Sequence, residues 1–569
     1  MNIYSNVLFM RGLFISVFQL FVCFIFAQDY PKHYFSSPLG DKLNVSSNFG
    51  KIRPNHFHSG IDINTKLKSG INIYAVAKGY ISRVKISSTG YGKAIYITHP
   101  NGFVSVYAHL SEIEKNVAAH VYKIQHQKKQ FEVDLNFPPG KFPIQKGAII
   151  GKSGNTGRSY GAHLHFEIRD EKSELALNPL LFDFNVPDNE APIIHDIYLY
   201  RFLDELKYGY YHEKNLLDIH ENDTIFSFGK LGLGLELRDY LSKKKGNFDV
   251  YQLKLSVDDS LYFKYKFKRF AFNETNYINS FIDYSELRKS GKKIIKCYIE
   301  PNNKLNIYET SQTGLFDFSD GQLHKLNILA ADIKGNATSF VFYIKSDSLQ
   351  IQAPPEKSTL VVKTIDYSKI DEFATDSFRI IFNENCLYDY LDFRYFVSQG
   401  HASNYSKYHY VHNPSIPLHN EATIEIMPCN FPQNLKNKAL IAGVGPRGRA
   451  FSVGGKWNNG FLQTNISNFG TYFIAIDTIL PTIEPFHYKT KKKKKSNFLH
   501  FKIKDELSGI QEYVCFIDGE WILFEYDEKN NLISCNLPSE NILEGRHDLI
   551  LWVRDKCNNL TIYESEFVY

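Results

Sequence analysis

An internal repeat constrains the fold of this chain more than any other feature. A polar, proline-marked stretch at 188–194 recurs at 477–483, and the same series of spaced residues follows each copy. The matching residues are His324, Asp332, Asn336 and Thr338 in the first copy, and His547, Asp555, Asn559 and Thr561 in the second. Their spacings are identical. The chain therefore contains two copies of one structural unit, on either side of a central segment.

Apolar and polar residues alternate in both copies, as at Leu326 and Ile328 and again at Leu549 and Leu551. A period of two places the apolar side chains on one face of a strand, which is typical of a two-sheet sandwich. The aspartate and asparagine are suited to the turn that follows. We predict immunoglobulin-like or fibronectin-like sandwiches at 187–350 (the first sandwich) and 477–569 (the last module), and a third sandwich at 355–476 (the central module).

Size and composition agree with several folded domains. At about 150 residues per domain, 569 residues correspond to three or four domains. Hydrophobic residues make up 43% and charged residues 22%, which excludes a disordered chain. The net charge of +5 is too small for this length to create a strong field, so we expect no nucleic-acid partner.

The first 27 residues have the pattern of a secretory signal peptide. Arg11 is their one charged residue, and an apolar run at 12–27 ends before Gln28 and Asp29. We predict cleavage after Ala27 and export to the periplasm, the cell envelope or the medium. A retained membrane anchor and lipid attachment at Cys23 are the alternatives. No later stretch is long and apolar enough to predict a membrane span.

Export would allow disulfides among the six remaining cysteines. They are scattered, with no CxxC pair: Cys297, Cys386, Cys429, Cys515, Cys535 and Cys557. Buried thiols, or one or two isolated bridges, fit this spacing better than a disulfide framework or a metal site. Cys515 and Cys535 are the favoured pair.

The candidate site residues of the domain that precedes the first repeat are mainly histidines. Its short alternating segments predict an all-β fold. His58 and Asp62 flank a glycine in a predicted turn that enters a strand, and His109 ends another strand. His163 and His165 share a predicted strand, where alternation places both imidazoles on one face. These residues could serve one site. Imidazole and carboxylate ligands suit Zn²⁺, and a catalytic zinc keeps three protein ligands and one open position.

These residues occur in motifs of one known family. The motifs are His58-x-x-x-Asp62, Tyr107-x-His109-Leu, and the glycine-rich stretch 151–168 that contains His163-Leu-His165. With them, residues 36–182 resemble the lysostaphin-type, or LytM-like, zinc endopeptidases that cut peptidoglycan cross-links. The resemblance implies a compact antiparallel β-fold in a metallopeptidase domain at 28–186.

The resemblance also implies a role for each site residue. His58, Asp62 and His165 match the family's ligands for one zinc ion, and His109 and His163 match its two non-ligand catalytic histidines. A neutral imidazole can take a proton from water and later stabilise the oxyanion or protonate the leaving amine. Which of the two histidines is the general base stays open.

Several nearby residues have competing interpretations. His56 is predicted to lie at the rim, since only His58 has the family's spacing to Asp62. Glu167 is either a partner that orients an imidazole or a surface carboxylate. Other histidines of the domain are predicted to face solvent: His99, His120 and His126.

Two segments have no clear counterpart in the motifs. The extra length at 116–141 predicts a short helix or hairpin beside the cleft. Three roles stay open for this insertion: it narrows substrate access, docks a partner or has no function. The lysine-rich run at 489–495 predicts a solvated hairpin turn, with attraction to anionic envelope polymers as the alternative.

The leading hypothesis is an exported zinc endopeptidase that acts on peptidoglycan stem peptides. The first alternative is a catalytically silent activator of other wall hydrolases. The second is an envelope adhesion or assembly protein whose sandwiches bind other envelope proteins. All five site positions, four histidines and one aspartate, are present in the sequence. This favours a catalytic protein over a silent activator.

Overall fold

The computed structural model describes residues 30–40, 43–202, 213–241, 245–350, 361–400, 405–486, 498–537 and 544–568. The predicted signal peptide at 1–27 and the lysine-rich run at 489–495 lie outside these residues. Strands dominate the regular structure, which confirms the all-β fold class. Among the described residues, no helix has the length and apolar character needed to cross a bilayer.

The N-terminal domain is built on one antiparallel sheet. Its main path is β1 (Val45–Ser47), β4 (Ile61–Asn64), β13 (His163–Asp170), β8 (Phe103–Ala108), β7 (Lys93–Thr98), β6 (Gly79–Ile86) and β10 (Val133–Asn136). Shorter strands add to it or form separate pairs: β11 (Pro143–Ile144), β14 (Ala176–Leu177), the hairpin of β2 (Ile52–Arg53) and β3 (His56–Phe57), and a small sheet of β5 (Asn72–Tyr74), β12 (Ile149–Lys152) and β9 (Glu112–Ile113). Alternating aliphatic residues bury one face of the main sheet, as Ile61 and Ile63 do.

The first sandwich has two sheets. One contains β16 (Glu213–Leu217), β15 (Ile193–Phe202), β18 (Gly229–Leu241) and β19 (Lys245–Phe248), with β23 (Ile294–Lys296) and β24 (Phe316–Phe318) also paired to β18. The other contains β17 (Thr224–Ser227), β26 (Ala337–Ser346), β25 (Leu323–Ala331), β20 (Gln252–Val257) and β21 (Ser260–Lys266). Two short helices, α3 (Ile278–Phe281) and α4 (Tyr284–Ser290), interrupt the strands.

The central and last modules are also two-sheet structures. The central sheets are β27 (Val361–Ile365), β30 (Leu391–Ser398), β31 (Tyr408–Val411), β37 (Gly470–Ile476), β33 (Ala439–Val444) and β34 (Ala450–Gly454), and β28 (Asp371–Ala374), β29 (Phe378–Phe382), β32 (Pro417–Ile426), β36 (Phe461–Asn468) and β35 (Lys456–Asn458). The last sheets are β38 (Thr482–Pro485), β39 (Phe498–Lys504), β43 (Leu532–Asn536) and β42 (Glu525–Asp527), and β41 (Glu520–Ile522), β40 (Ile510–Ile517), β44 (Arg546–Asp555) and β45 (Leu560–Val568).

The repeated residues make the same contacts in both copies. Thr338 Oγ1 donates to the Pro192 carbonyl and Thr561 Oγ1 to the Pro481 carbonyl, each at 2.5 Å. Both asparagines donate to the aspartate four residues earlier, with 2.6 Å between Nδ2 and Oδ2 in each copy. The aspartates also accept backbone N–H groups of the turn that follows. This confirms the turn role predicted for the aspartate and asparagine.

The first sandwich is fused to the N-terminal domain. Its strand β22 (Arg269–Phe270) pairs with β14 and so extends the N-terminal sheet. Phe57 of β3 packs against aromatic rings of the sandwich, with its centroid 5.2 Å from that of Phe267 and 5.5 Å from that of Phe281. Asp249 Oδ2 accepts the backbone N–H of Ile52 at 2.5 Å. The core of the first sandwich therefore includes side chains of the N-terminal domain, which also has a separate core of its own.

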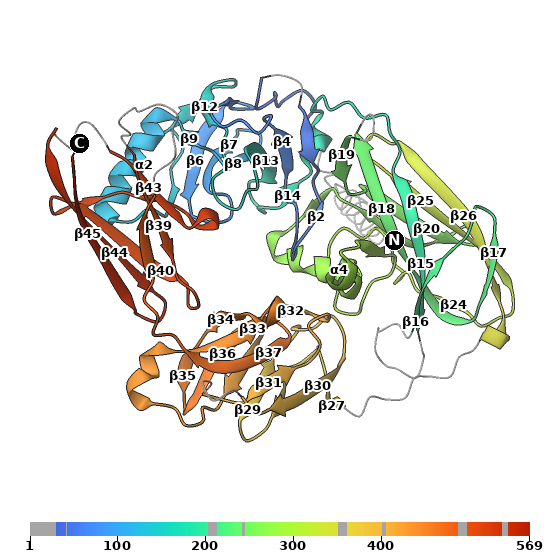
Figure 1. Cartoon of the computed structure of the whole chain (residues 1–569). Coiled ribbons are helices and arrows are strands. Elements are labelled where there is room, and N and C mark those ends of the chain that lie inside the picture. Colours follow the sequence, from blue (N-terminus) through green and yellow to red (C-terminus); the bar gives the residue numbers. More distant parts are fainter. Residues whose placement is uncertain are drawn as a thin grey trace, which may run out of the picture.

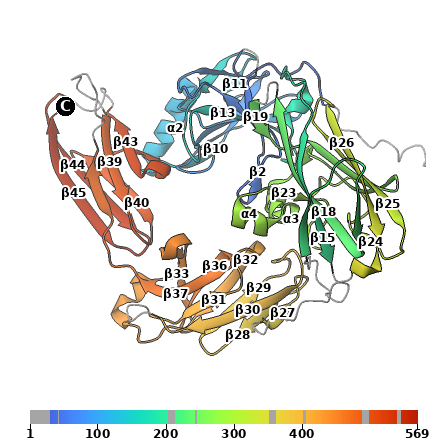
Figure 2. The ribbon, with the colours of Figure 1, turned by 45° about the vertical axis from the view of Figure 1, so that its right-hand side comes forward.

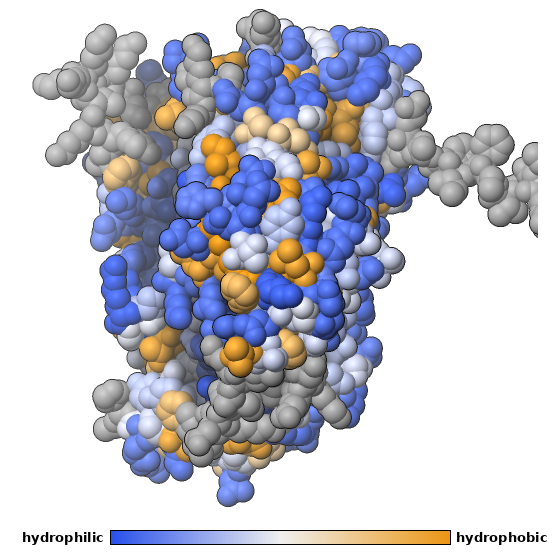
Figure 3. Space-filling view, turned by 90° about the vertical axis from the view of Figure 1, so that its right-hand side faces the viewer, coloured by the Kyte–Doolittle hydropathy of each residue, from blue (hydrophilic) through white to orange (hydrophobic). Residues whose placement is uncertain are grey.

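The four domains follow one another around a ring, so that the last module returns to the N-terminal domain (Figures 1 and 2). The predicted insertion forms the helix α2 (Lys115–Lys128) and the edge strand β10. The ring centroids of His126 in α2 and Trp521 in the last module are 5.0 Å apart. The helix therefore contacts another part of the same chain. The face of the molecule shown in Figure 3 is mainly hydrophilic, with small separate groups of hydrophobic residues.

Two sequence-based expectations are wrong. The favoured pair Cys515 and Cys535 forms no disulfide. All six described cysteines are free thiols and all but Cys429 are buried, which agrees with the alternative expectation of buried thiols. Apolar packing of single thiols in the sandwich cores accounts for their positions. His99 does not face solvent, because it is buried between the Lys78 carbonyl and the Ser105 hydroxyl, which it contacts at 2.9 and 2.7 Å.

Candidate metal centre and active site

Strand β13 brings the candidate site together. It lies between β4, which carries Asp62, and β8, which leads into His109. In this register His165 is paired with Asp62 on one side and with Ala108 on the other. Gly60 allows the close approach of the chain before β4, because a Cβ atom at this position would clash with the Phe166 carbonyl oxygen. The glycine between His58 and Asp62 is thus required by the packing of these two strands.

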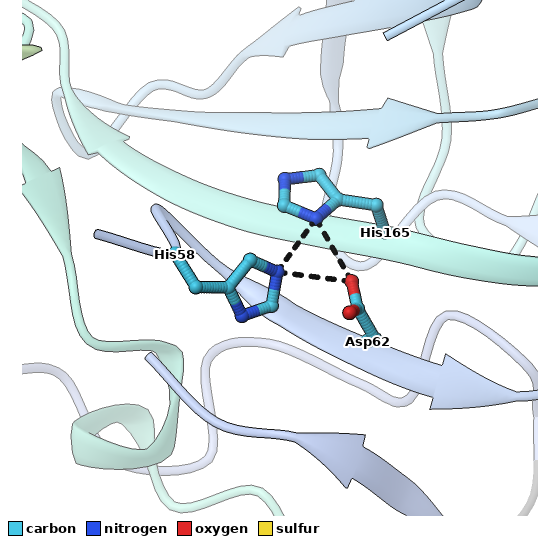
Figure 4. A group of neighbouring side chains, drawn as sticks. All are labelled: His58, Asp62 and His165. Carbon is cyan, nitrogen blue, oxygen red and sulfur yellow. Dashed lines mark hydrogen bonds and ion pairs between the residues drawn. The ribbon is translucent and has the colours of Figure 1, made fainter. Parts of the chain in front are cut away.

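Three side chains converge on one point (Figure 4). His58 Nε2 lies 2.9 Å from Asp62 Oδ1 and 3.0 Å from His165 Nδ1, and the third distance, from His165 Nδ1 to Asp62 Oδ1, is 3.0 Å. All three residues are at most 9% exposed. A triangle of two imidazole nitrogens and one carboxylate oxygen matches the donor set that zinc prefers. These three residues could therefore hold a metal ion.

Neighbouring acceptors orient both imidazoles. His58 Nδ1 lies 2.7 Å from the Asn48 carbonyl, and His165 Nε2 lies 2.8 Å from Glu167 Oε1. A carbonyl and a carboxylate accept, so these nitrogens carry the protons of the neutral rings. The lone pairs of His58 Nε2 and His165 Nδ1 then point toward Asp62. This is the arrangement that fixes metal-binding histidines in proteins.

Glu167 is completely buried behind His165. Its Oε1 accepts hydrogen bonds from the hydroxyls of Ser59 and Tyr91 at 2.5 Å, and its Oε2 accepts from Arg169 Nε at 2.7 Å. Burial acts to raise its pKa, but the charges of Arg169 and His165 and these hydrogen bonds lower it. Of its two sequence-based interpretations, the orienting partner is correct and the surface carboxylate is wrong.

The two other histidines lie beside the triangle. His163 Nε2 is 3.5 Å from Asp62 Oδ1, and the ring centroids of His109 and His163 are 4.9 Å apart. The His109 Nδ1 is 2.9 Å from the Thr156 carbonyl, and the His163 Nδ1 is 2.8 Å from the Gly161 carbonyl. In the neutral ring of His109, Nδ1 therefore carries the proton and Nε2 can accept one, whereas Nε2 of His163 faces Asp62.

Burial and neighbouring charges shift the pKa values of these groups in different directions. Burial opposes ionisation of Asp62, but His58 and the close contacts with His163 and His165 hold its pKa well below the usual range. Burial also acts against charge on His165, yet in the absence of a metal ion its bonds to Asp62 and Glu167 raise its pKa to about 9, so a metal ion that binds here would displace a proton from this ring. Burial and the neighbouring imidazoles lower the pKa of His109 to about 3. His109 is thus neutral near pH 7, as a general base must be.

The structure adds a residue to the site that the sequence-based reasoning missed. Arg53 donates to Asp62 Oδ2 at 2.7 Å and to the Ser47 hydroxyl at 2.9 Å. It orients the carboxylate oxygen that lies away from the triangle. The position of Arg53 shortly before the His58 motif in the chain was the sequence feature that could have indicated this role. His56 is exposed, as expected for a rim residue.

A second acidic group lies in the last module. Asp477, Asp505 and Asp555 place carboxylate oxygens within 4.8 Å of one another. Backbone N–H groups occupy many of these oxygens: Ser508 N donates to Asp477 Oδ2, Gly509 N to Asp505 Oδ2, and Cys557 N to Asp555 Oδ1. We interpret this group as part of the repeated turn structure.

Family models match two parts of the chain. Residues 56–126 match the model of peptidase family M23, and residues 362–477 match that of a Zu5-like domain. The chain contains an M23 peptidase domain. The M23 match begins at the strand that leads into His58 and includes His109. This confirms the prediction of a lysostaphin-type domain.

Curated relatives match the peptidase domain. The DD-carboxypeptidase/endopeptidase Mpg of Neisseria meningitidis is 31% identical over 134 residues, which are 24% of each chain. An uncharacterized metalloprotease of Haemophilus influenzae is 29% identical over 152 residues, 25% of this chain and 26% of its own. The match thus spans about a quarter of these relatives.

Solved structures also match this domain. The catalytic domain of the prophage-encoded M23 protein EnpA from Enterococcus faecalis (A109H mutant) is 25% identical, covers 26% of this chain and 95% of its own, and gives a TM-score of 0.19. The catalytic domain of lysostaphin from Staphylococcus simulans is 23% identical, covers 24% of this chain and 90% of its own, and also gives 0.19.

Proposed function

We propose that this protein is an exported zinc endopeptidase that hydrolyses peptide cross-links of bacterial peptidoglycan. The observation that carries the proposal is the triangle of His58, Asp62 and His165, with His109 and His163 beside it. Membership of the domain in family M23 supports peptidase activity. The apolar run at 12–27 supports export, and peptidoglycan then becomes the accessible substrate.

The chain provides each group that peptide hydrolysis needs. Zinc, when bound by His58, Asp62 and His165, would supply Lewis-acid polarisation of the scissile carbonyl and acidify water. The imidazoles of His109 and His163 lie beside the triangle, where an imidazole can take a proton from the attacking water. The protonated ring can then donate to the oxyanion or to the leaving amine. Glu167 and Arg53 keep the ligand side chains in place.

The proposal is tested by zinc content and by release of fragments from purified peptidoglycan. We expect the wild-type chain to hold one zinc ion and to release fragments, and both properties to be lost in His165→Ala. His220→Ala is the matched control, because the His220 side chain is 91% exposed. Full activity of the metal-free protein would contradict the proposal.

The same assay separates the alternatives. No hydrolysis by the chain alone, combined with stimulation of an added wall amidase, would support the activator interpretation. Mass analysis of the released fragments identifies the bond that is cut. Detection of the mature protein outside the cytoplasm, beginning after Ala27, tests export.

A further inference from the structure

A large cavity lies where the N-terminal domain, the first sandwich and the central module face one another. Its volume is about 1140 Å³. The walls come from the turn between β2 and β3, from α4 and the residues after it, and from β30, β31, β34, β36 and β37 of the central module. In Figures 1 and 2, β2 and α4 lie on the inner side of the ring and face the central module. The cavity therefore exists only in the assembled chain.

One wall of this cavity is cationic. It carries Lys51, Arg288 and Lys293, together with Arg53, whose charge is paired with that of Asp62. No aspartate or glutamate belongs to the described residues that line the cavity. Lys293 Nζ donates to the Ile52 carbonyl at 2.9 Å, which holds this lysine against the β2 strand. Low-dielectric walls that carry one sign of charge concentrate ligands of the opposite sign. The charge of this wall selects an anionic ligand.

The opposite wall is aromatic. Phe396 and Tyr410 stack with ring centroids 4.0 Å apart, and Phe396 remains 51% exposed. Phe451 also lines the cavity and is 46% exposed. Exposed apolar groups that gather in a hollow with polar residues around it mark binding sites. A ligand between the two walls needs both carboxylates and small apolar groups.

The cavity is connected to the catalytic site by one residue. Arg53 lines the cavity and also donates to Asp62, one of the three candidate metal ligands, at 2.7 Å. Arg53 therefore lies between the cavity and the metal centre. None of the three candidate metal ligands lines the cavity, so a substrate segment held there would lie apart from the bond to be cut.

We propose that this cavity binds an acidic peptide segment of the substrate, with its carboxylates on Arg288 and Lys293 and its small apolar side chains on Phe396 and Phe451. This inference rests on the proposed function, because it names the part of the substrate that lies beyond the catalytic centre. A stem peptide that alternates alanine with carboxylate-bearing residues has the required chemistry.

The test measures binding of a fluorescent tetrapeptide of alanine, glutamate, diaminopimelate and alanine to the full chain. This probe has no cross-link to cut. We expect Arg288→Gln and Phe396→Gln each to raise its Kd about fivefold, and added salt to weaken wild-type binding. Two control variants should bind as the wild type does. Lys289→Gln removes the adjacent exposed charge of α4, and Phe226→Gln removes a 59% exposed aromatic residue outside the cavity.

Two results would overturn the cavity proposal: wild-type Kd values for both cavity variants, or equal binding of a probe whose carboxylates are amidated. Its failure is distinguishable from failure of the proposed function. Hydrolysis of peptidoglycan with an unchanged Kd and KM in both variants rejects the cavity and retains the endopeptidase. Carboxylate-dependent binding that is lost in the variants, without any hydrolysis, supports the cavity and rejects the endopeptidase.

Discussion

Lys93 Nζ of the peptidase domain lies 2.6 Å from Glu525 Oε1 of the last module, although 432 residues separate them in the chain. Nearby, Lys529 donates to the carbonyls of Asn155 and Gly157. The residue between these two, Thr156, accepts the hydrogen bond that orients His109. The last module therefore supports the loop that positions a candidate catalytic histidine.

We expect Lys529→Met to reduce kcat about three- to tenfold with little change in KM, because a loosened Thr156 carbonyl orients His109 less well. Initial rates on purified cross-linked peptide measure both constants. Lys556→Met is the control, since it removes an exposed lysine of the same module that has no such contact. A change in KM alone would show that Lys529 acts in binding and not in positioning.

Glu167→Gln should lower zinc affinity about 10- to 100-fold while the domain stays folded. The amide oxygen can still accept from His165 Nε2, but the charge that stabilises this ligand is lost. Competition with a chromophoric chelator measures the affinity, and circular dichroism checks the fold. The exposed Glu171→Gln is the matched control. Equal zinc affinity in the two variants would contradict the orienting role.

Phe270→Ala should destabilise the protein by about 3–5 kcal/mol and should also weaken zinc binding. Phe270 is buried against Phe49 and Phe57, and Phe57 precedes the ligand His58. Denaturant unfolding and zinc titration report the two effects. Phe382→Ala, in the core of the central module, should cost similar stability without a change in zinc affinity. Loss of zinc affinity in both variants would reject a specific coupling.

Asp239→Asn should stabilise the protein, and by more at pH 8 than at pH 5. Burial and the charges of Asp188 and Asp332 raise the pKa of Asp239 to about 8. Between the ordinary value near 4 and pH 8 the folded state therefore binds more protons than the unfolded state, so the stability falls as pH rises. We expect a gain of at least about 1 kcal/mol at pH 8.

Thermal unfolding at both pH values measures this effect. Glu221→Gln removes an exposed carboxylate from the same sandwich and should change the unfolding temperature little at either pH. If Asp239→Asn gave the same small change at both pH values, ionisation of Asp239 would not limit the stability of the first sandwich.

Much of the candidate site could be predicted because its residues follow strand geometry. His163 and His165 share one face of β13 through period-two alternation, and Gly60, between His58 and Asp62, lies where the chain passes close to β13. The repeated aspartates and asparagines likewise make local turn contacts. Contacts of this kind join residues that are close in the chain, so the sequence pattern predicts them.

The sequence by itself determined the all-β class, the repeated units and the residues that could bind a metal. Only the tertiary structure decided that Glu167 is buried behind His165, that β22 completes the peptidase sheet, and that the last module reaches the Thr156 loop. These contacts join residues that are far apart in the chain or depend on which face of a sheet is covered. Alternation and spacing describe one strand at a time, whereas packing between domains sets which distant surfaces meet.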